Sequence, residues 1–185
     1  MASREAPERH VAFLRAVNVG GRNRVPMADL RDLLEGLGYG DVSTHLQSGN
    51  AVFETAGTTA RQVAAEIEGA LAGHLSVTAK VLVRSADELE WAIVANPLAD
   101  IAEDPARLLV TFLSAAPPRE ALEGLAAADF EPDVFAFGER EVYVWCPEGL
   151  NATKLSNAFW EKRLGVAATG RNWRTVTRML ELARG

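Results

Sequence analysis

The 185-residue sequence has few of the residues that usually reveal a chemistry. A single cysteine, Cys146, excludes an internal disulfide and a cysteine-rich zinc cluster, and it is typical of proteins from a reducing compartment. The three histidines, His10, His45 and His74, are scattered, and no serine–histidine–aspartate pattern indicates a catalytic triad. No metal-binding spacing of histidine, cysteine or carboxylate residues is present. We therefore expect neither a metal nor a cofactor.

Long hydrophobic runs are also missing. No apolar stretch approaches the roughly 20 residues that a membrane span needs, so we expect no membrane partner. Residues 1–9 are charged and lack the apolar centre of a secretory signal. We interpret them as a short disordered lead and expect a cytoplasmic protein.

The net charge of −6 argues against bulk nucleic-acid binding, but the charge is unevenly distributed. Residues 85–148 carry three basic and fourteen acidic side chains, whereas residues 149–185 carry seven basic and two acidic ones. The basic C-terminal segment is either a positive patch for an anionic partner or the electrostatic counterpart of the acidic segment. Both interpretations remain open from the sequence.

Apolar periodicity predicts the order strand, helix, strand, strand, helix, strand within residues 10–84. Pro26 suits the first turn of the first helix, and Gly38 can close it. Thr58 or Thr59 is expected to cap the second helix. The expected strands are residues 10–17, 41–47, 51–55 and 79–84.

The same order is expected again after a link over residues 85–105, which includes a helix over 85–96 opened by a Ser85–Glu88 capping box. We expect Asn151 or Thr153 to cap the helix over 152–165, and Asn172 to cap the last helix. The other expected elements are strands 106–115, 133–138 and 141–147, a short strand within "VAAT", and helices 117–127 and 172–183.

The repeated order predicts an α+β protein with two ferredoxin-like βαββαβ halves, each an antiparallel sheet with helices on one face. The first half covers residues 10–84. The second covers residues 106–185 and includes a C-terminal tail helix.

In this topology the loop after the first strand and the hairpin between the second and third strands share one end of the sheet. The segments "NVGGRNR" (18–24) and "QSGN" (47–50) should therefore be neighbours. A glycine pair, arginines and a helix start suit a phosphate or carboxylate, but the segments match no phosphate-loop motif, and their composition alone favours ordinary turns. The candidate ligand-binding residues are Asn18, Gly20, Gly21, Arg22, Arg24, Gln47, Ser48, Gly49 and Asn50.

A second polar corner is expected where "CPEGLNATK" and "ATGRNW" leave their strands. Its charged residues can also be rim charges, and its asparagines helix caps. Tyr143 and Trp145 alternate on one strand, as in a base-stacking platform, but a covered sheet face explains them equally well. The residues of this second corner are Asn151, Lys154, Arg171 and Asn172.

Two long segments resemble the bacterial domain-of-unknown-function 1697 family. They are "FLRAVNVGGRNRVPMADLRDLLEGLGYGDVSTHLQSGNAVF" (13–53) and "NATKLSNAFWEKRLGVAATGRNWRTVTRMLEL" (151–182). "ANPL" and "DPARLLVTFL" resemble its middle, although Leu98 stands where an aromatic residue is expected. The resemblance implies a compact α+β protein of ferredoxin-like halves and no known activity, and both polar corners coincide with its characteristic stretches.

The sequence favours a module that binds a phosphate-bearing or other anionic ligand, such as a nucleotide or nucleic acid, at residues 18–24 and 47–50. Two alternatives remain open. One is a small enzyme acting on an anionic metabolite, which lacks an evident general base. The other is a protein-interaction module or homo-oligomer that uses the acidic segment or a strand edge.

Overall fold

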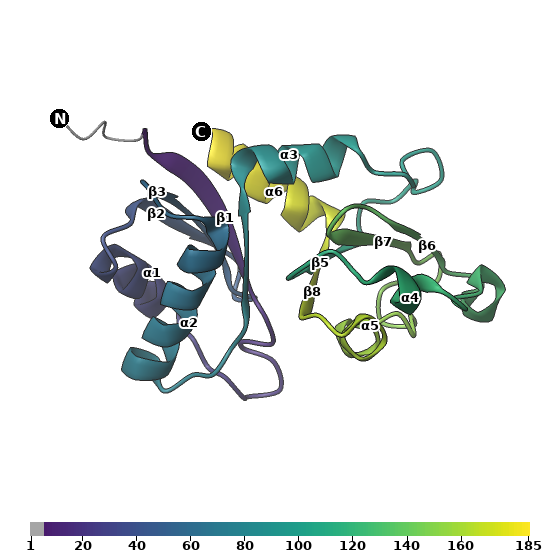
Figure 1. The fold of residues 1–185 in the computed structure, drawn as a ribbon, viewed down its shortest axis with the longest axis horizontal. Helices are drawn as coiled ribbons and strands as arrows, with labels where there is room; N and C mark the ends of the chain where they lie inside the picture. The colour runs from purple at the N-terminus through teal and green to yellow at the C-terminus, as the bar shows by residue number, and fades with distance from the viewer. Residues whose placement is uncertain (1–5) are drawn as a thin grey trace. The chain divides into compact units, whose positions relative to one another are not determined.

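The computed structural model describes residues 6–185, which form two compact units (Figure 1). One unit contains residues 6–90 together with 178–185, and the other contains residues 91–177. We call them unit 1 and unit 2. The last residues of the C-terminal helix belong to unit 1, although they follow the second half in sequence.

Unit 1 contains a four-stranded antiparallel sheet in the order β2-β3-β1-β4. The helices α1 and α2 pack on one face of this sheet (Figure 1). The strands are β1 (Glu8–Leu14), β2 (Gly40–His45), β3 (Asn50–Thr55) and β4 (Val81–Ser85), and the helices are α1 (Met27–Gly36) and α2 (Ala60–Leu75).

Unit 2 repeats the arrangement with the order β6-β7-β5-β8. Its elements are β5 (Leu108–Leu113), α4 (Arg119–Leu122), a 3-10 helix η1 (Ala127–Phe130), β6 (Val134–Phe137), β7 (Glu141–Trp145), α5 (Asn157–Leu164) and β8 (Ala168–Asn172). Two further helices, α3 (Ala86–Val94) and α6 (Trp173–Arg184), complete the chain. Two antiparallel sheets of identical strand order confirm the predicted α+β class with ferredoxin-like halves.

The core of unit 1 follows from the two periodicities of its sequence. Ala12 and Leu14 of β1 alternate toward the helices, and Leu30 and Leu34 of α1 lie one turn apart on its buried face. Thr59 caps α2 through a reciprocal capping box with Gln62. The order of elements is therefore encoded locally in this half.

Several elements begin or end at residues other than those predicted from the sequence. Strand β1 ends at Leu14, earlier than the predicted residue 17, because Ala16 adopts a φ of 55° that cannot continue a strand. Residues 1–5 of the predicted lead lie outside the described residues, whereas Glu8 and Arg9 belong to β1.

The predicted helix over 117–127 is wrong in its length. Helix α4 covers only Arg119–Leu122, because Glu123 is extended and Gly124 has a φ of +75°. The 3-10 helix η1 follows after this break. A glycine that can adopt the left-handed region thus interrupts a sequence whose composition is otherwise helical.

The helix predicted over 152–165 begins later, at Asn157, and neither Asn151 nor Thr153 caps it. Ser156 is the cap, and its side chain accepts a hydrogen bond from the Phe159 amide. Thr153 is instead used in a turn, where its hydroxyl oxygen accepts from the Leu155 amide. By contrast, the predicted Ser85–Glu88 capping box at the start of α3 is confirmed.

Strand β8 covers residues 168–172, so "ATGRN" forms the strand rather than the loop after it. It pairs with β5 from Leu113↔Ala168 to Leu109↔Asn172. Arg171 and Asn172 are consequently strand residues. The local sequence did not show this because the pairing joins segments that are far apart in the chain.

Candidate functional site

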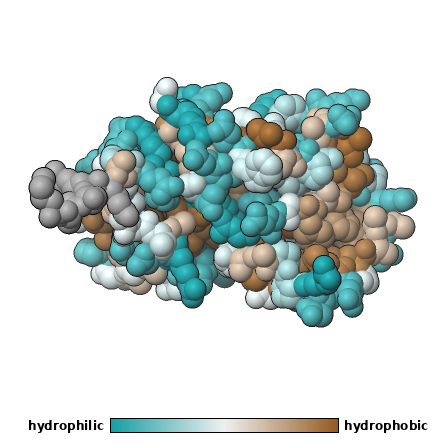
Figure 2. Space-filling model, turned by 45° about the horizontal axis from the view of Figure 1, so that its top comes forward, coloured by the Kyte–Doolittle hydropathy of each residue, from teal (hydrophilic) through white to brown (hydrophobic). Residues whose placement is uncertain are grey.

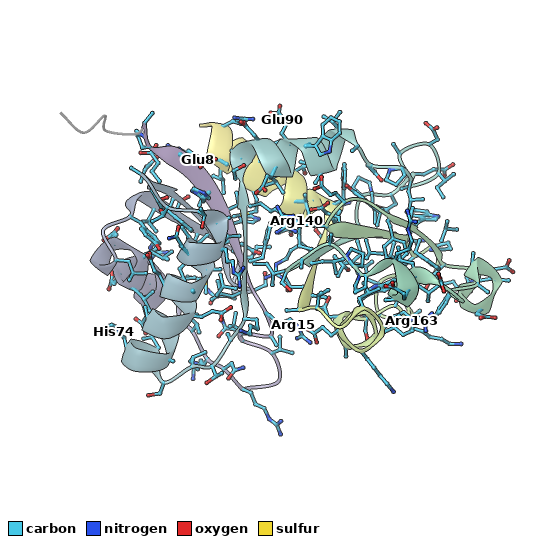
Figure 3. All side chains as sticks on the ribbon, viewed as in Figure 1. Glu8, Arg15, His74, Glu90, Arg140 and Arg163 are labelled. Carbon is cyan, nitrogen blue, oxygen red and sulfur yellow. The ribbon has the colours of Figure 1, made fainter. Side chains whose placement is uncertain are left out.

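The two segments that the sequence placed at one sheet end do meet there. We call residues 15–26 and 46–49 the corner. The amide nitrogen Nδ2 of Asn18 donates to the Gln47 carbonyl at 2.6 Å, and the Leu14 amide donates to the Gly49 carbonyl at 2.8 Å. Figure 3 labels Arg15 at the end of β1 from which the loop leaves and Glu8 at the opposite end. The neighbourhood predicted from topology is therefore present.

Asn18 organises the loop itself. Its Nδ2 also donates to the Val25 carbonyl, and its Oδ1 accepts from the Val25 amide, each at 2.8 Å. The Asn18 amide donates to the Asn23 carbonyl at 3.0 Å. The side chain is thus committed to backbone groups within the corner, which gives it an architectural role.

The glycine pair forms the tip of a tight turn. The Arg22 amide donates to the Val19 carbonyl at 3.1 Å, and Gly20 and Gly21 between them have φ values of 59° and 75°. Positive φ at both central residues is the pattern of a type I′ turn, which favours glycine. A Cβ on either glycine would meet nothing within 4 Å, so the space beside this turn is open.

The charges of the corner have one sign. Residues 15–26 contain Arg15, Arg22 and Arg24 and no acidic residue, and residues 46–49 contain no charged residue. Arg22 and Arg24 are exposed, and neither forms an ion pair within the described residues. Three positive charges therefore concentrate here in a chain whose net charge is −6.

The hairpin turn is built around Asn50 and Gly49. Asn50 is fully buried, and its Nδ2 donates to the His45 carbonyl at 2.7 Å and to the Ser48 hydroxyl at 2.9 Å. Gly49 has a φ of 78°, and a Cβ there would lie 2.6 Å from Val17 Cγ2. These residues shape the turn, whereas Gln47 and Ser48 are exposed.

The corner also contains most of the described non-glycine residues that have positive φ. The described residues include six non-glycine positions with positive φ, and four of them, Ala16, Asn18, Asn23 and Leu46, lie here. Positive φ is especially unfavourable for a bulky residue such as Leu46. Such strain persists only where surrounding contacts impose it, and it concentrates at functional positions.

Two exposed hydrophobic side chains accompany the arginines, and the sequence analysis did not single them out. Val19 is 65% exposed and Leu46 is 57% exposed. Other exposed hydrophobic residues exist, including Trp91 and Val94, and the face in Figure 2 shows brown residues gathered toward its right side as well as among hydrophilic ones. The only sequence signal for Val19 and Leu46 was their position inside the predicted loops.

In the second corner, both strand exits lie at one end of the sheet, as predicted. Trp145 at the end of β7 pairs with Leu108, and Asn172 at the end of β8 pairs with Leu109. The side chains of Arg171 and Asn172, however, have internal roles.

Asn172 caps α6 by accepting from the Thr175 amide at 2.9 Å, which confirms that predicted cap. Arg171 is buried, and its Nη1 donates to the Thr169 hydroxyl and to the Gly170 carbonyl. Asn151 and Lys154 are exposed on the loop after β7.

Two buried titratable groups of unit 2 are held in their neutral forms. Burial, followed by the charge of Asp133, raises the pKa of Cys146 to about 11, although a hydrogen bond with Thr153 opposes this. Burial, and to a lesser extent the Glu141 carboxylate, raises the pKa of the Tyr143 hydroxyl, which donates to the Ala92 carbonyl at 2.5 Å. Cys146 is therefore no ready nucleophile, and Tyr143 is a packing residue.

Within residues 6–185, no group of three histidine, cysteine or carboxylate side chains could hold a metal ion. Over the same range, no helix is both long and apolar enough to cross a membrane. A pocket of about 590 Å³ in unit 1 is lined by residues 6–8, 55 and 57–59, at the end of the sheet opposite the corner.

The repeated four-stranded sheet defines a class of α+β proteins with two ferredoxin-like halves, and in the first half a glycine–arginine loop lies beside the β2–β3 hairpin. The chain belongs to the family described as "Protein of unknown function (DUF1697)", which matches residues 8–143. The matched range includes the whole corner and ends before Asn151 and Lys154 of the second one.

A solved structure shares this fold. The chain is similar to the conserved bacterial protein SP0830 from Streptococcus pneumoniae, with 24% sequence identity and a TM-score of 0.71. The similarity covers 96% of this chain and 99% of that one. No curated protein matches the sequence.

Proposed function

We propose that the corner of unit 1 binds a phosphate-bearing or other anionic ligand. The observation that supports this most is the pair of exposed arginines Arg22 and Arg24, in two loops that contain no acidic residue and that a hydrogen bond joins. A local positive potential attracts an anion even when the whole protein is negative, because charges beyond a Debye length of about 8–10 Å are screened.

The groups suited to contact the ligand are the exposed ones. The guanidinium groups of Arg22 and Arg24 can each form paired hydrogen bonds to phosphate or carboxylate oxygens. The open space beside Gly20 and Gly21 allows an anion to approach the backbone of the turn.

Helix α1 begins at Met27 directly after the loop and no side chain caps it, but the Asp29 carboxylate in its first turn opposes the binding of an anion at the helix end. Gln47 and Ser48 are further candidates for ligand contact. Asn18, Gly49 and Asn50 instead maintain the shape of the corner. They are therefore removed from the candidate ligand-binding residues that the sequence suggested.

Thermal unfolding in increasing concentrations of inorganic phosphate and pyrophosphate tests the proposal. A ligand at 100 times its Kd stabilises the native state by about 2.7 kcal/mol, which raises Tm by about 5–10 °C in a chain of this size. We expect the Arg22→Ala/Arg24→Ala double variant to lose this increase.

The matched control is Arg61→Ala. Arg61 is an exposed arginine of α2, whose start lies at the opposite end of the same sheet because it follows the end of β3. It should retain the full ligand-induced increase in Tm. No increase in the wild-type protein with either anion, or an equal loss in Arg61→Ala, contradicts the proposal.

A further inference from the structure

The two exposed hydrophobic side chains of the corner belong to sequence neighbours of Asn18 and Gln47, whose hydrogen bond joins its loops. Val19 directly follows Asn18, and Leu46 directly precedes Gln47, so each is one Cα–Cα step of about 3.8 Å from a bonded residue. Both are more than half exposed. Aliphatic side chains thus accompany the arginines at the same sheet end. An inorganic anion has no apolar surface that could pack against them.

We propose that the ligand is a single-stranded nucleic acid, an inference that rests on the proposed function. Its phosphates bind Arg22 and Arg24, and its bases pack on Val19 and Leu46. Arg22 and Arg24 are separated by one residue and are both exposed, so they can contact neighbouring phosphates of a strand. An ionic backbone with apolar faces at short intervals matches this combination of side chains.

The exposure of the corner favours a strand over a free mononucleotide. Small-molecule sites enclose most of the ligand surface in a concave pocket. Val19 and Leu46 are instead 65% and 57% exposed, and the space beside Gly20 and Gly21 is open. A strand gains its affinity from several contacts on such a surface.

A peptide that pairs with the loop as an added strand fits less well. Peptides that bind along a backbone need unpaired strand-like groups, as in β-augmentation. In the loop, backbone amides and carbonyls already bond to each other: the Arg22 amide donates to the Val19 carbonyl, and the Asn18 amide donates to the Asn23 carbonyl. A phosphate backbone needs only the guanidinium groups and the open turn.

The residues also indicate the kind of binding. Residues 15–26 and 46–49 contain no aromatic residue, so bases contact aliphatic surface and do not stack on rings. We expect weak binding that tolerates different base sequences and depends on salt. With two phosphate contacts, log K should decrease with log salt with a slope of about −1.4, and Arg24→Ala should reduce the slope by about 0.7.

The test measures fluorescence anisotropy of a labelled 12-nucleotide oligo(dT) against three variants of the full chain. Val19→Ser/Leu46→Ser should weaken binding of the oligonucleotide about fivefold or more, and should leave the pyrophosphate-induced increase in Tm unchanged. Arg22→Ala/Arg24→Ala should weaken both. Val94→Ser is the matched control, because Val94 is 73% exposed on α3 in a different part of the sequence, and it should change neither.

The outcomes separate the two proposals. If the wild-type protein binds neither pyrophosphate nor the oligonucleotide, anion binding at the corner is contradicted. Pyrophosphate binding without oligonucleotide binding, or oligonucleotide binding unaffected by Val19→Ser/Leu46→Ser, overturns only the nucleic-acid assignment. A polyglutamate peptide of equal charge that displaces the oligonucleotide equally well also overturns it, in favour of an acidic protein partner.

Discussion

The side-chain amide of Asn18 donates a hydrogen bond to the backbone carbonyl of Gln47, 29 residues later, and this 2.6 Å contact joins the two loops of the corner. Its partners are backbone groups. Asparagine suits the position because it supplies a donor and an acceptor together and tolerates the observed φ of 56°.

Replacement of Asn18 by leucine should reduce the free energy of unfolding by about 1–3 kcal/mol. The variant loses the bonds to Gln47 and Val25 and leaves those backbone groups without their partner. Urea unfolding measures the loss. Asn23→Leu is the matched control, because Asn23 also has a positive φ but its side chain makes only a 3.3 Å contact to Ala16. Equal losses in the two variants would show that backbone conformation, and not the joining bond, explains the effect.

Gly49→Ala should be more destabilising than Gly20→Ala by about 1–3 kcal/mol. Both glycines have positive φ, so both variants incur the conformational penalty. Only at position 49 would the new Cβ also meet Val17 Cγ2 at 2.6 Å and Leu14 Cβ at 2.8 Å, whereas at position 20 it meets nothing. Comparing the Tm values of Gly49→Ala and Gly20→Ala isolates the cost of the steric clash at position 49. Similar Tm values for the two variants would contradict this prediction.

Ser156→Ala should reduce stability by about 1 kcal/mol, because α5 loses the hydroxyl that accepts from the Phe159 amide. Asn151→Ala, at the exposed position that the sequence suggested as the cap, should change stability by less than about 0.5 kcal/mol. Chemical denaturation of both variants decides between the two caps. A larger effect at position 151 would contradict the observed helix start.

Cys146 should resist alkylation at pH 8 in the native protein and react promptly after unfolding. Its pKa is raised to about 11, so little thiolate exists at that pH, and its side chain is fully buried.

The raised pKa of Cys146 also determines how the stability of the protein depends on pH. Its contribution to stability is fully present below the ordinary thiol pKa of about 8.5 and is lost as the pH rises toward 11, because only the unfolded chain ionises freely in that interval.

A thiol-reagent time course, together with urea unfolding at pH 7.5 and 10, measures both effects. Cys146→Ser is the control for the contribution of this thiol to the pH dependence. Fast native-state labelling at pH 8 would show that the thiol is accessible and contradict the assignment.

The order of elements was predictable because it depends on local patterns. Leu30 and Leu34 mark a helix face, and alternation marks β7, so the repeated βαββαβ order could be read without tertiary information. That order implies which loops share a sheet end. The meeting of residues 18–24 with residues 47–50 therefore followed from topology, although nothing in either loop alone shows it.

Capping residues were predictable where the helix start was unambiguous, as at Ser85 and Asn172. They were not predictable at α5, because Asn151, Thr153 and Ser156 are all good caps. The choice depends on how the loop after Cys146 folds, and its Thr153 hydroxyl bonds within a turn.

The sequence by itself determined the α+β class, the two ferredoxin-like halves and the sheet end where the glycine–arginine loop lies, because periodicity and turn chemistry act over a few residues. Only the tertiary structure decided that Asn18, Gly49 and Asn50 build the corner, that Arg171 lies in a strand, and that Val19 and Leu46 are exposed beside the arginines. The physical reason is that hydrogen-bond partners and burial depend on contacts between distant segments, which local patterns do not specify.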